Sequence, residues 1–253
     1  MYLFKKLTAT YNFTTTTVFT DGRKSEFAKQ EDLTINREKR DKYLVTLLQS
    51  SGESLNGAEL DDFDKIMLRI GKTVYPAEIM ITGKGEALEV VNFGEIKSRS
   101  IEEAYKLKHE YEGVFWIEQY INLASAKLNS GRTLLESLRR SGVCQFLFWN
   151  TESENNELTL CNFPEAGINI PAAFGKGKNS CGAWHYNTAI AEYSEIGILG
   201  GNAKVTCRYS ELGDLLTASA KFTVEHKGKG YYRKIISMSV NPETYSIRTG
   251  FFG

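Results

Sequence analysis

Apolar and polar residues alternate with a period of two over the first part of the chain. Between Lys6 and Phe19 one face of this pattern is apolar and the other is rich in threonine. Such alternation is typical of a half-buried β-strand. Further strands are predicted near Glu26–Asn36 and over Tyr43–Leu48. Two β-rich runs joined by a glycine loop over residues 74–93 predict a hairpin.

Helical spacing appears twice before residue 142. Asn56 is followed by Glu59, which resembles a capping box, and apolar residues then recur at helical intervals up to Ile70. A second such signature at residues 92–95 begins a helical block that extends to Gly142, with Gly113 as a kink or a separator. Ser130 is expected to cap the last helix of this block.

The remainder of the chain returns to β patterns. The apolar run Val143–Trp149 predicts either a buried strand or a bridge from helix to sheet, and Glu157–Phe163 predicts a short strand. Residues 164–182 contain prolines and four glycines and are predicted to form the longest loop, which we expect to be functional or mobile. From Ala183 onward, alternating runs separated by turn residues predict an antiparallel meander.

This order of elements predicts an α+β fold. We expect a large, mostly antiparallel, curved β-sheet of about nine to eleven strands, with three or four helices from the middle of the chain packed on one face. The interpretation is a single domain over residues 1–253. It can be divided into a β-rich half (1–92), a helical layer (93–142) and a C-terminal meander (143–253), and the β-rich ends form either one sheet or two.

The amino-acid composition limits the classes of function that we expect. The chain has 253 residues, of which 42% are hydrophobic and 25% charged, and its formal net charge is zero. These values are typical of a globular protein, and they give nucleic acid no general electrostatic attraction. We find no continuous apolar run of signal-peptide or membrane-span length, so we expect a cytoplasmic protein with no membrane span and no nucleic-acid partner. A chain trimmed of its leader would look the same.

Motifs for metal, cofactor and phosphate binding are weak. The four cysteines, at positions 144, 161, 181 and 207, lack the close pairing of a zinc site and are interpreted as free thiols. Residues 174–180 contain glycines and lysines but depart from the P-loop spacing. We therefore expect neither a metal nor a cofactor.

His185 is the one histidine with aromatic neighbours and a nearby thiol. It is a weak catalytic candidate, because Cys181 would lie about 13 Å away along a regular strand, too far for proton transfer. A hydrolase-type enzyme with a site near residues 164–186 is the alternative function.

The chain is rich in aromatic residues, which either pack the core or line an apolar space. Such a space would lie between the helices and the curved sheet, with Trp116, Trp149, Trp184 and Tyr186 as candidate ligand-binding residues. The leading hypothesis is therefore a non-enzymatic binding protein for a hydrophobic small molecule or a protein partner. Phe251 and Phe252 form either a sheet edge or an exposed anchor for that partner.

Two segments resemble known sequences. Residues 74–99, with Val-Tyr-Pro-Ala-Glu-Ile at their start and Val-Val-Asn-Phe-Gly-Glu-Ile-Lys-Ser-Arg at their end, are similar to uncharacterised bacterial α+β proteins. The turn and strand Asn241–Arg248 are similar to the end of such chains. The resemblance covers about a fifth of the chain and implies a bacterial α+β fold, with no activity or catalytic residues to carry over.

Overall fold

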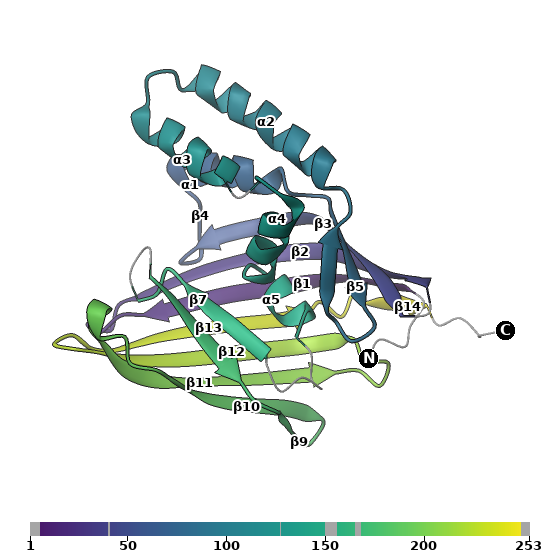
Figure 1. Ribbon diagram of the computed structural model, residues 1–253, viewed down its shortest axis with the longest axis vertical. Coiled ribbons are helices and arrows are strands. Elements are labelled where there is room, and N and C mark those ends of the chain that lie inside the picture. Colours follow the sequence, from purple (N-terminus) through teal and green to yellow (C-terminus); the bar gives the residue numbers. More distant parts are fainter. Residues whose placement is uncertain (1–5, 40, 127, 150–155, 165–167, 249–253) are drawn as a thin grey trace.

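One large antiparallel sheet dominates the computed structural model, which describes residues 6–39, 41–126, 128–149, 156–164 and 168–248. Within those ranges the sheet has 12 strands in the order β6-β5-β3-β2-β1-β13-β12-β11-β10-β9, with β14 paired to β1 and β4 paired to β3. Its strands are β1 (Lys6–Val18), β2 (Lys24–Lys39), β3 (Lys42–Leu55), β4 (Ala58–Glu59), β5 (Ala77–Thr82), β6 (Ala87–Val90), β9 (Lys178–Ser180), β10 (Ala183–Ile190), β11 (Ile198–Tyr209), β12 (Leu215–His226), β13 (Gly230–Val240) and β14 (Ser246–Arg248). The sheet is open and curved, so the predicted α+β class is confirmed (Figure 1).

The two β-rich ends of the chain meet at the centre of this sheet. Strand β1 pairs with β2 on one side and with β13 on the other, in a register that runs from Tyr11 opposite Val240 to Val18 opposite Arg233. The hydroxyl of Tyr11 also donates a hydrogen bond of 2.7 Å to the carbonyl oxygen of Leu215. The ends therefore form one continuous sheet.

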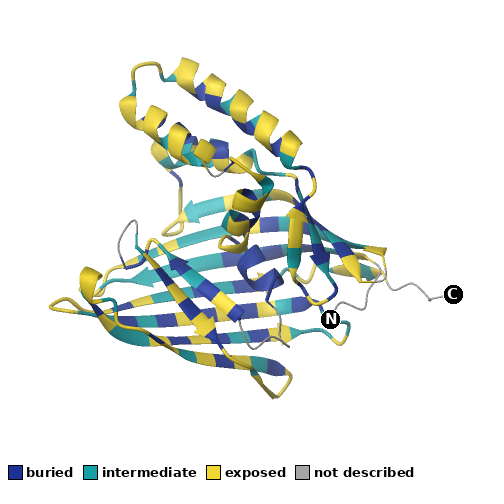
Figure 2. Ribbon diagram, in the orientation of Figure 1, coloured by how far each residue is buried: buried dark blue, intermediate teal, exposed yellow. Residues whose placement is uncertain are grey.

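Burial alternates along the strands, as Figure 2 shows by its alternating colours. On β1 the predicted apolar face is buried, and the same holds for β12 from Ala218 to Val224. Because successive side chains of a strand point to opposite faces, this alternation gives the sheet one face that packs a core and one that is polar.

The α-helices divide into two groups. A short 3-10 turn at Ser194–Ile196, between β10 and β11, belongs to neither group. Three of the α-helices lie beyond the β3–β4 edge of the sheet and share a small core of their own (Figure 1). In that group Arg69 of the first helix bonds to Glu103 at 2.7 Å and to Glu110 at 2.6 Å, both on the second. These helices are α1 (Asp62–Lys72), α2 (Phe93–Glu110) and α3 (Phe115–Ala126).

The second group lies over the core-packing face of the sheet. It contains α4 (Gly131–Arg139) and α5 (Cys144–Leu147), together with a separate hairpin of β7 (Asn156–Cys161) and β8 (Asn169–Phe174). Ser130 caps α4 as predicted, since its hydroxyl accepts a hydrogen bond of 3.1 Å from the Thr133 amide. Buried residues of α4, α5 and both hairpin strands belong to the same core as the sheet.

The predicted start of α1 is wrong by several residues. Asn56 and Gly57 have positive φ angles of 54° and 75° and form a turn between β3 and β4, and the helix is capped by Asp61 instead. Asn-Gly is a strong hairpin signal, and here it outweighs the capping pattern. At α2 the Asn92 side chain caps no helix amide, because its amide group bonds to the backbone at Glu78 and Pro76.

Two other predictions also need correction. Of the two alternatives for the Val143–Trp149 run, the strand is wrong: the run contains the short helix α5 and is buried among the sheet, α4 and the hairpin. The predicted loop at 164–182 contains β8 and β9, and in β8 buried residues alternate with exposed ones from Ile170 onward. Residues 165–167, like Phe251 and Phe252, lie outside the described part of the chain.

Candidate functional site

A cavity of about 250 Å³ separates the helices from the sheet. It lies between α1, α3 and α4 on one side and strands β2 and β3 on the other, in the space that the sequence singled out. Most of its wall is apolar. The apolar lining residues are Phe27, Leu68, Ile70, Val74, Tyr75, Tyr120, Ala124, Leu128, Leu134 and Leu138.

One part of the wall of this mostly apolar cavity is polar and contains the ion pair of Glu53 and Lys72. The carboxylate of Glu53, whose side chain is 8% exposed, accepts a hydrogen bond of 2.8 Å from the Ser50 hydroxyl and lies 3.2 Å from Lys72 Nζ. Burial raises the pKa of Glu53, but the hydrogen bonds from Ser50, its own backbone and Lys72 outweigh burial and leave that pKa below its ordinary value. The pair is therefore charged and satisfied at neutral pH.

A second polar group, Glu31, joins this wall to the segment between α4 and α5. It is 3% exposed, and it accepts hydrogen bonds from Lys29 Nζ (2.9 Å), the Tyr75 hydroxyl (2.6 Å) and the Val143 amide (2.7 Å). Burial, followed by the Glu31 charge, raises the pKa of Tyr75, so this phenol stays a donor. Gly142 has a φ of 51°, and a Cβ there would overlap the Glu31 carboxylate.

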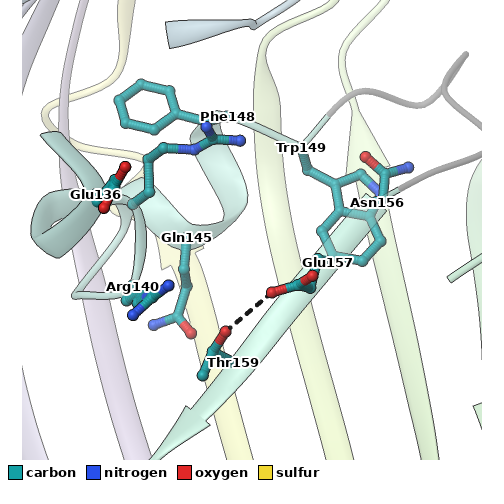
Figure 3. Close-up of a pocket in the computed structure, with 9 residues that line it drawn as sticks. Glu136, Arg140, Gln145, Phe148, Trp149, Asn156, Glu157 and Thr159 are labelled. Atoms are coloured by element: carbon teal, nitrogen blue, oxygen red, sulfur yellow. Dashed lines mark hydrogen bonds between the residues drawn. The ribbon is translucent and has the colours of Figure 1, made fainter. Parts of the chain in front are cut away.

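A different cavity, of about 400 Å³, lies on the other side of α4. It is mostly polar and is formed by the end of α4, by α5 and by β7. Figure 3 shows Arg140 and Gln145 on one side of it, with Trp149 and Glu157 on the other. Its lining residues are Glu136, Arg139, Arg140, Gln145, Phe148, Trp149, Asn156, Glu157 and Thr159.

Three of the four predicted ligand-binding aromatics lie in the sheet core. The rings of Trp149 and Tyr186 are 5.0 Å apart, Phe174 lies 5.3 Å from Trp149, and Trp184 is half-buried on the same strand as Tyr186. Burial raises the pKa of Tyr186 to about 12, and the Trp149 indole lowers it in part. Neither Trp149 Nε1 nor the Tyr186 hydroxyl makes a hydrogen bond of good geometry among the described residues.

Trp116, the fourth aromatic, lies in the α1–α3 group and packs on Phe63 with ring centroids 4.7 Å apart. The structure thus brings three of the predicted residues together and places the fourth elsewhere. Trp149 lines the polar cavity, and none of the four lines the apolar cavity. Their role in binding stays a prediction.

His185 lies on the exposed face of β10, opposite the core. Its Nδ1 is 3.3 Å from the Thr206 hydroxyl, and in the described ranges it hydrogen-bonds to neither a cysteine nor a carboxylate. Cys181, the nearby thiol, occupies the exposed turn between β9 and β10 with a φ of 51°. The catalytic role of His185 stays a prediction.

Apart from Trp149, the residues that line the two cavities were not predicted from the sequence. In the sequence, Leu134 and Leu138 recur at helical spacing and Arg139 and Arg140 are adjacent, but neither pattern shows what lies opposite. In the apolar cavity the opposing wall includes Phe27, more than one hundred residues earlier in the chain, and no local signal connects the two.

Nowhere in the described residues do three or more His, Cys, Asp or Glu side chains gather closely enough to hold a metal ion. None of their helices combines the length and the apolar character that crossing a membrane requires.

Comparisons with known proteins give little further information. No protein-family model matches the chain. No curated protein sequence matches it. Among solved structures, one titled for lipid–protein interactions in lipovitellin aligns with 100% of this chain at 5% identity and a TM-score of 0.45, and the chain spans only 26% of its length.

A LolA superfamily protein, NE2245 from Nitrosomonas europaea, aligns over 97% of this chain and 87% of its own, at 8% identity and a TM-score of 0.19. Both TM-scores are too low to carry an argument about the fold or the ligand. The resemblance to bacterial α+β proteins therefore stays a prediction.

Proposed function

We propose that this protein binds an apolar small molecule in the cavity between α1, α3, α4 and the sheet. The observation that carries the proposal is the cavity itself, with an apolar wall interrupted by a few polar groups. Ligand pockets of proteins are typically lined in this way, and their volumes start at roughly 300 Å³, close to the volume here.

The polar groups of the wall support a neutral ligand. Lys72 is paired with Glu53, and Lys29 is paired with Glu31. Because each ammonium group already has a carboxylate, a charged ligand would have to replace an existing ion pair. Burial of apolar surface, at about 25 cal/mol per Å², is then the main contribution to affinity.

The helical side of the cavity gives it a way to open. α3 contributes Tyr120 and Ala124 to the wall, but it belongs to the α1–α3 group, whose core is separate from that of the sheet. No described residue of α3 belongs to the main core, so a shift of α3 relative to the sheet would widen the cavity without disturbing that core. We therefore place ligand entry between α3 and α4.

The test is a titration with phenylnaphthylamine, an uncharged apolar fluorophore, monitored by its emission. We expect saturable binding to the wild-type protein. Ala124→Phe places a benzyl group in the cavity and should weaken binding about tenfold, which corresponds to about 1.4 kcal/mol. Ser125→Phe adds the same group at an exposed position on the same helix that does not line the cavity, and it should bind like the wild type.

Native mass spectrometry of the protein purified from its source is the companion measurement, because it retains a natural ligand and reports its mass. Equal fluorophore binding by Ala124→Phe and wild type would show that this cavity is not the binding site. A protein partner stays the alternative hypothesis from the sequence.

A further inference from the structure

The polar cavity beside α4 has two arginine side chains in its wall. Arg139 is the last residue of α4 and Arg140 its C-cap, and both line the cavity. Neither has a carboxylate partner among the described residues, whereas Arg132, on the same helix, lies 3.3 Å from Glu136. The cavity therefore has two guanidinium groups available to an anion.

The position of these arginines at the end of a helix explains only part of this arrangement. Basic residues there interact favourably with the helix dipole, by about 0.3–1 kcal/mol at an exposed site. That effect needs no cavity and no second arginine. A guanidinium group presents its N–H donors as a planar fork that matches a carboxylate or a phosphate, so arginines in a cavity wall suit an oxyanion.

The opposite wall of this cavity carries a carboxylate and an acceptor oxygen in place of positive charge. β7 contributes Glu157, whose carboxylate accepts a hydrogen bond of 3.3 Å from the Thr159 hydroxyl (Figure 3). Gln145, 9% exposed, donates from Nε2 to the Gly142 carbonyl at 3.0 Å, which leaves its side-chain oxygen as an acceptor. This wall repels an anion and accepts hydrogen bonds from ligand hydroxyl groups.

We propose that this cavity binds a small hydroxylated oxyanion, of the phosphate or carboxylate class. Its anionic end contacts Arg139 and Arg140, its hydroxyl groups donate to Glu157 and Gln145, and its carbon skeleton contacts Trp149. The volume of about 400 Å³ fits a molecule of that size. A free polyol phosphate and the glycerophosphate head group of a lipid share this chemistry.

The first experiment is isothermal titration calorimetry with glycerol 3-phosphate and with inorganic phosphate. We expect glycerol 3-phosphate to bind more tightly, and added salt to weaken both. The double substitution Arg139→Gln/Arg140→Gln should weaken binding at least tenfold. Lys97→Gln/Lys108→Gln is the matched control: it removes two exposed positive charges from α2, outside the cavity lining, and should leave binding unchanged.

Glu157→Gln tests the opposite wall. It removes the repulsion of the anion and keeps an acceptor oxygen, so inorganic phosphate should bind more tightly. The preference for glycerol 3-phosphate over inorganic phosphate should fall severalfold, since a charged acceptor becomes a neutral one. An unchanged preference would overturn the placement of the ligand hydroxyls.

The source of the ligand is tested with vesicles of phosphatidylcholine, prepared with and without phosphatidic acid. Binding of glycerol 3-phosphate in solution supports a free ligand. Binding only to vesicles with phosphatidic acid, lost in the double variant, supports a lipid head group. No binding in either format, or equal loss in Lys97→Gln/Lys108→Gln, overturns the proposal. The two cavities share no lining residue, so this proposal and the apolar one fail independently.

Discussion

Removal of the Glu31 carboxylate should destabilise the protein strongly. Glu31→Ala leaves three donors without their acceptor: the partly buried Lys29 ammonium and Tyr75 hydroxyl, and the buried Val143 amide. Removing one partner of a buried ion pair costs about 3–5 kcal/mol, and most of that cost comes from the charge left behind. Some of it is offset because Lys29 Nζ also lies 5.6 Å from the ring centroid of Phe13. We expect a loss of about 4 kcal/mol in the free energy of unfolding.

A substitution at Gly142 provides an internal check on the predicted loss of stability. Gly142→Ala costs about 1–2 kcal/mol for the left-handed backbone alone, and more because the new Cβ overlaps the Glu31 carboxylate. In the Glu31→Ala background the Cβ has no carboxylate to overlap, so only the backbone part of the cost of Gly142→Ala remains. The double variant should therefore be more stable than the sum of the single changes predicts, by about 1 kcal/mol or more.

The assay is urea unfolding followed by tryptophan fluorescence and far-UV circular dichroism. Coincident transitions are required before free energies are compared. Glu31→Gln keeps the shape and an acceptor oxygen, and should lose only about 2 kcal/mol. If Glu31→Ala loses less than Glu31→Gln, or if the Gly142 and Glu31 effects are additive, the reasoning about this buried carboxylate is wrong.

Two further predictions concern pH and thiol chemistry. Since the pKa of Glu53 is lower in the folded protein than its ordinary value of 4.5, its stabilisation is complete above that pH and is lost as the pH falls through the folded value. The difference in urea midpoint between wild type and Glu53→Gln should shrink below pH 4.5, and a constant difference would contradict the shift. Cys181 is exposed, whereas Cys144 and Cys207 are buried, and burial raises the pKa of Cys207 to about 12. Ellman's reagent should therefore label Cys181 in the native protein and the other two only after unfolding, as peptide mass mapping would show, and prompt labelling of Cys207 would refute its burial.

Patterns that depend on neighbouring residues predicted much of this fold. The period of two in β1 and β12 identified the strands and their buried faces, because alternation along a strand directly reflects which face meets the core. The cap at Ser130 was equally local, since one hydroxyl and one amide three residues later define it.

The errors arose where one pattern fits two structures. An apolar run of seven residues, Val143–Trp149, fits a buried strand as well as a helix surrounded on all sides. Pro171 suggested an irregular segment, but it lies in β8 opposite Thr159, and a strand of a two-stranded hairpin tolerates the missing donor. The sequence contained the alternation around Pro171, which is the signal that would have found the strand.

The site was predicted only in outline. The space between the helices and the sheet follows from the order of elements, but its lining depends on how α4 lies across β2 and β3. That arrangement is set by tertiary contacts such as the one between Glu31 and the Val143 amide, separated by 112 positions in the sequence. The tryptophans drew attention to the sheet core, whereas the cavity lining contains four leucines and two tyrosines but no tryptophan.

The pairing of β1 with β13 has a consequence for how the chain reaches its native state. β1 emerges from the ribosome early and β13 late, and their register places Tyr11, near the start of the chain, opposite Val240, near its end. Until β13 is made, β1 has an unpaired edge at what becomes the middle of the sheet. Such edges are templates for pairing with other chains. Contacts this distant in sequence also slow folding. Closure of this central pairing should therefore be a late step of folding, and the interval before it is when the nascent chain is most prone to aggregate.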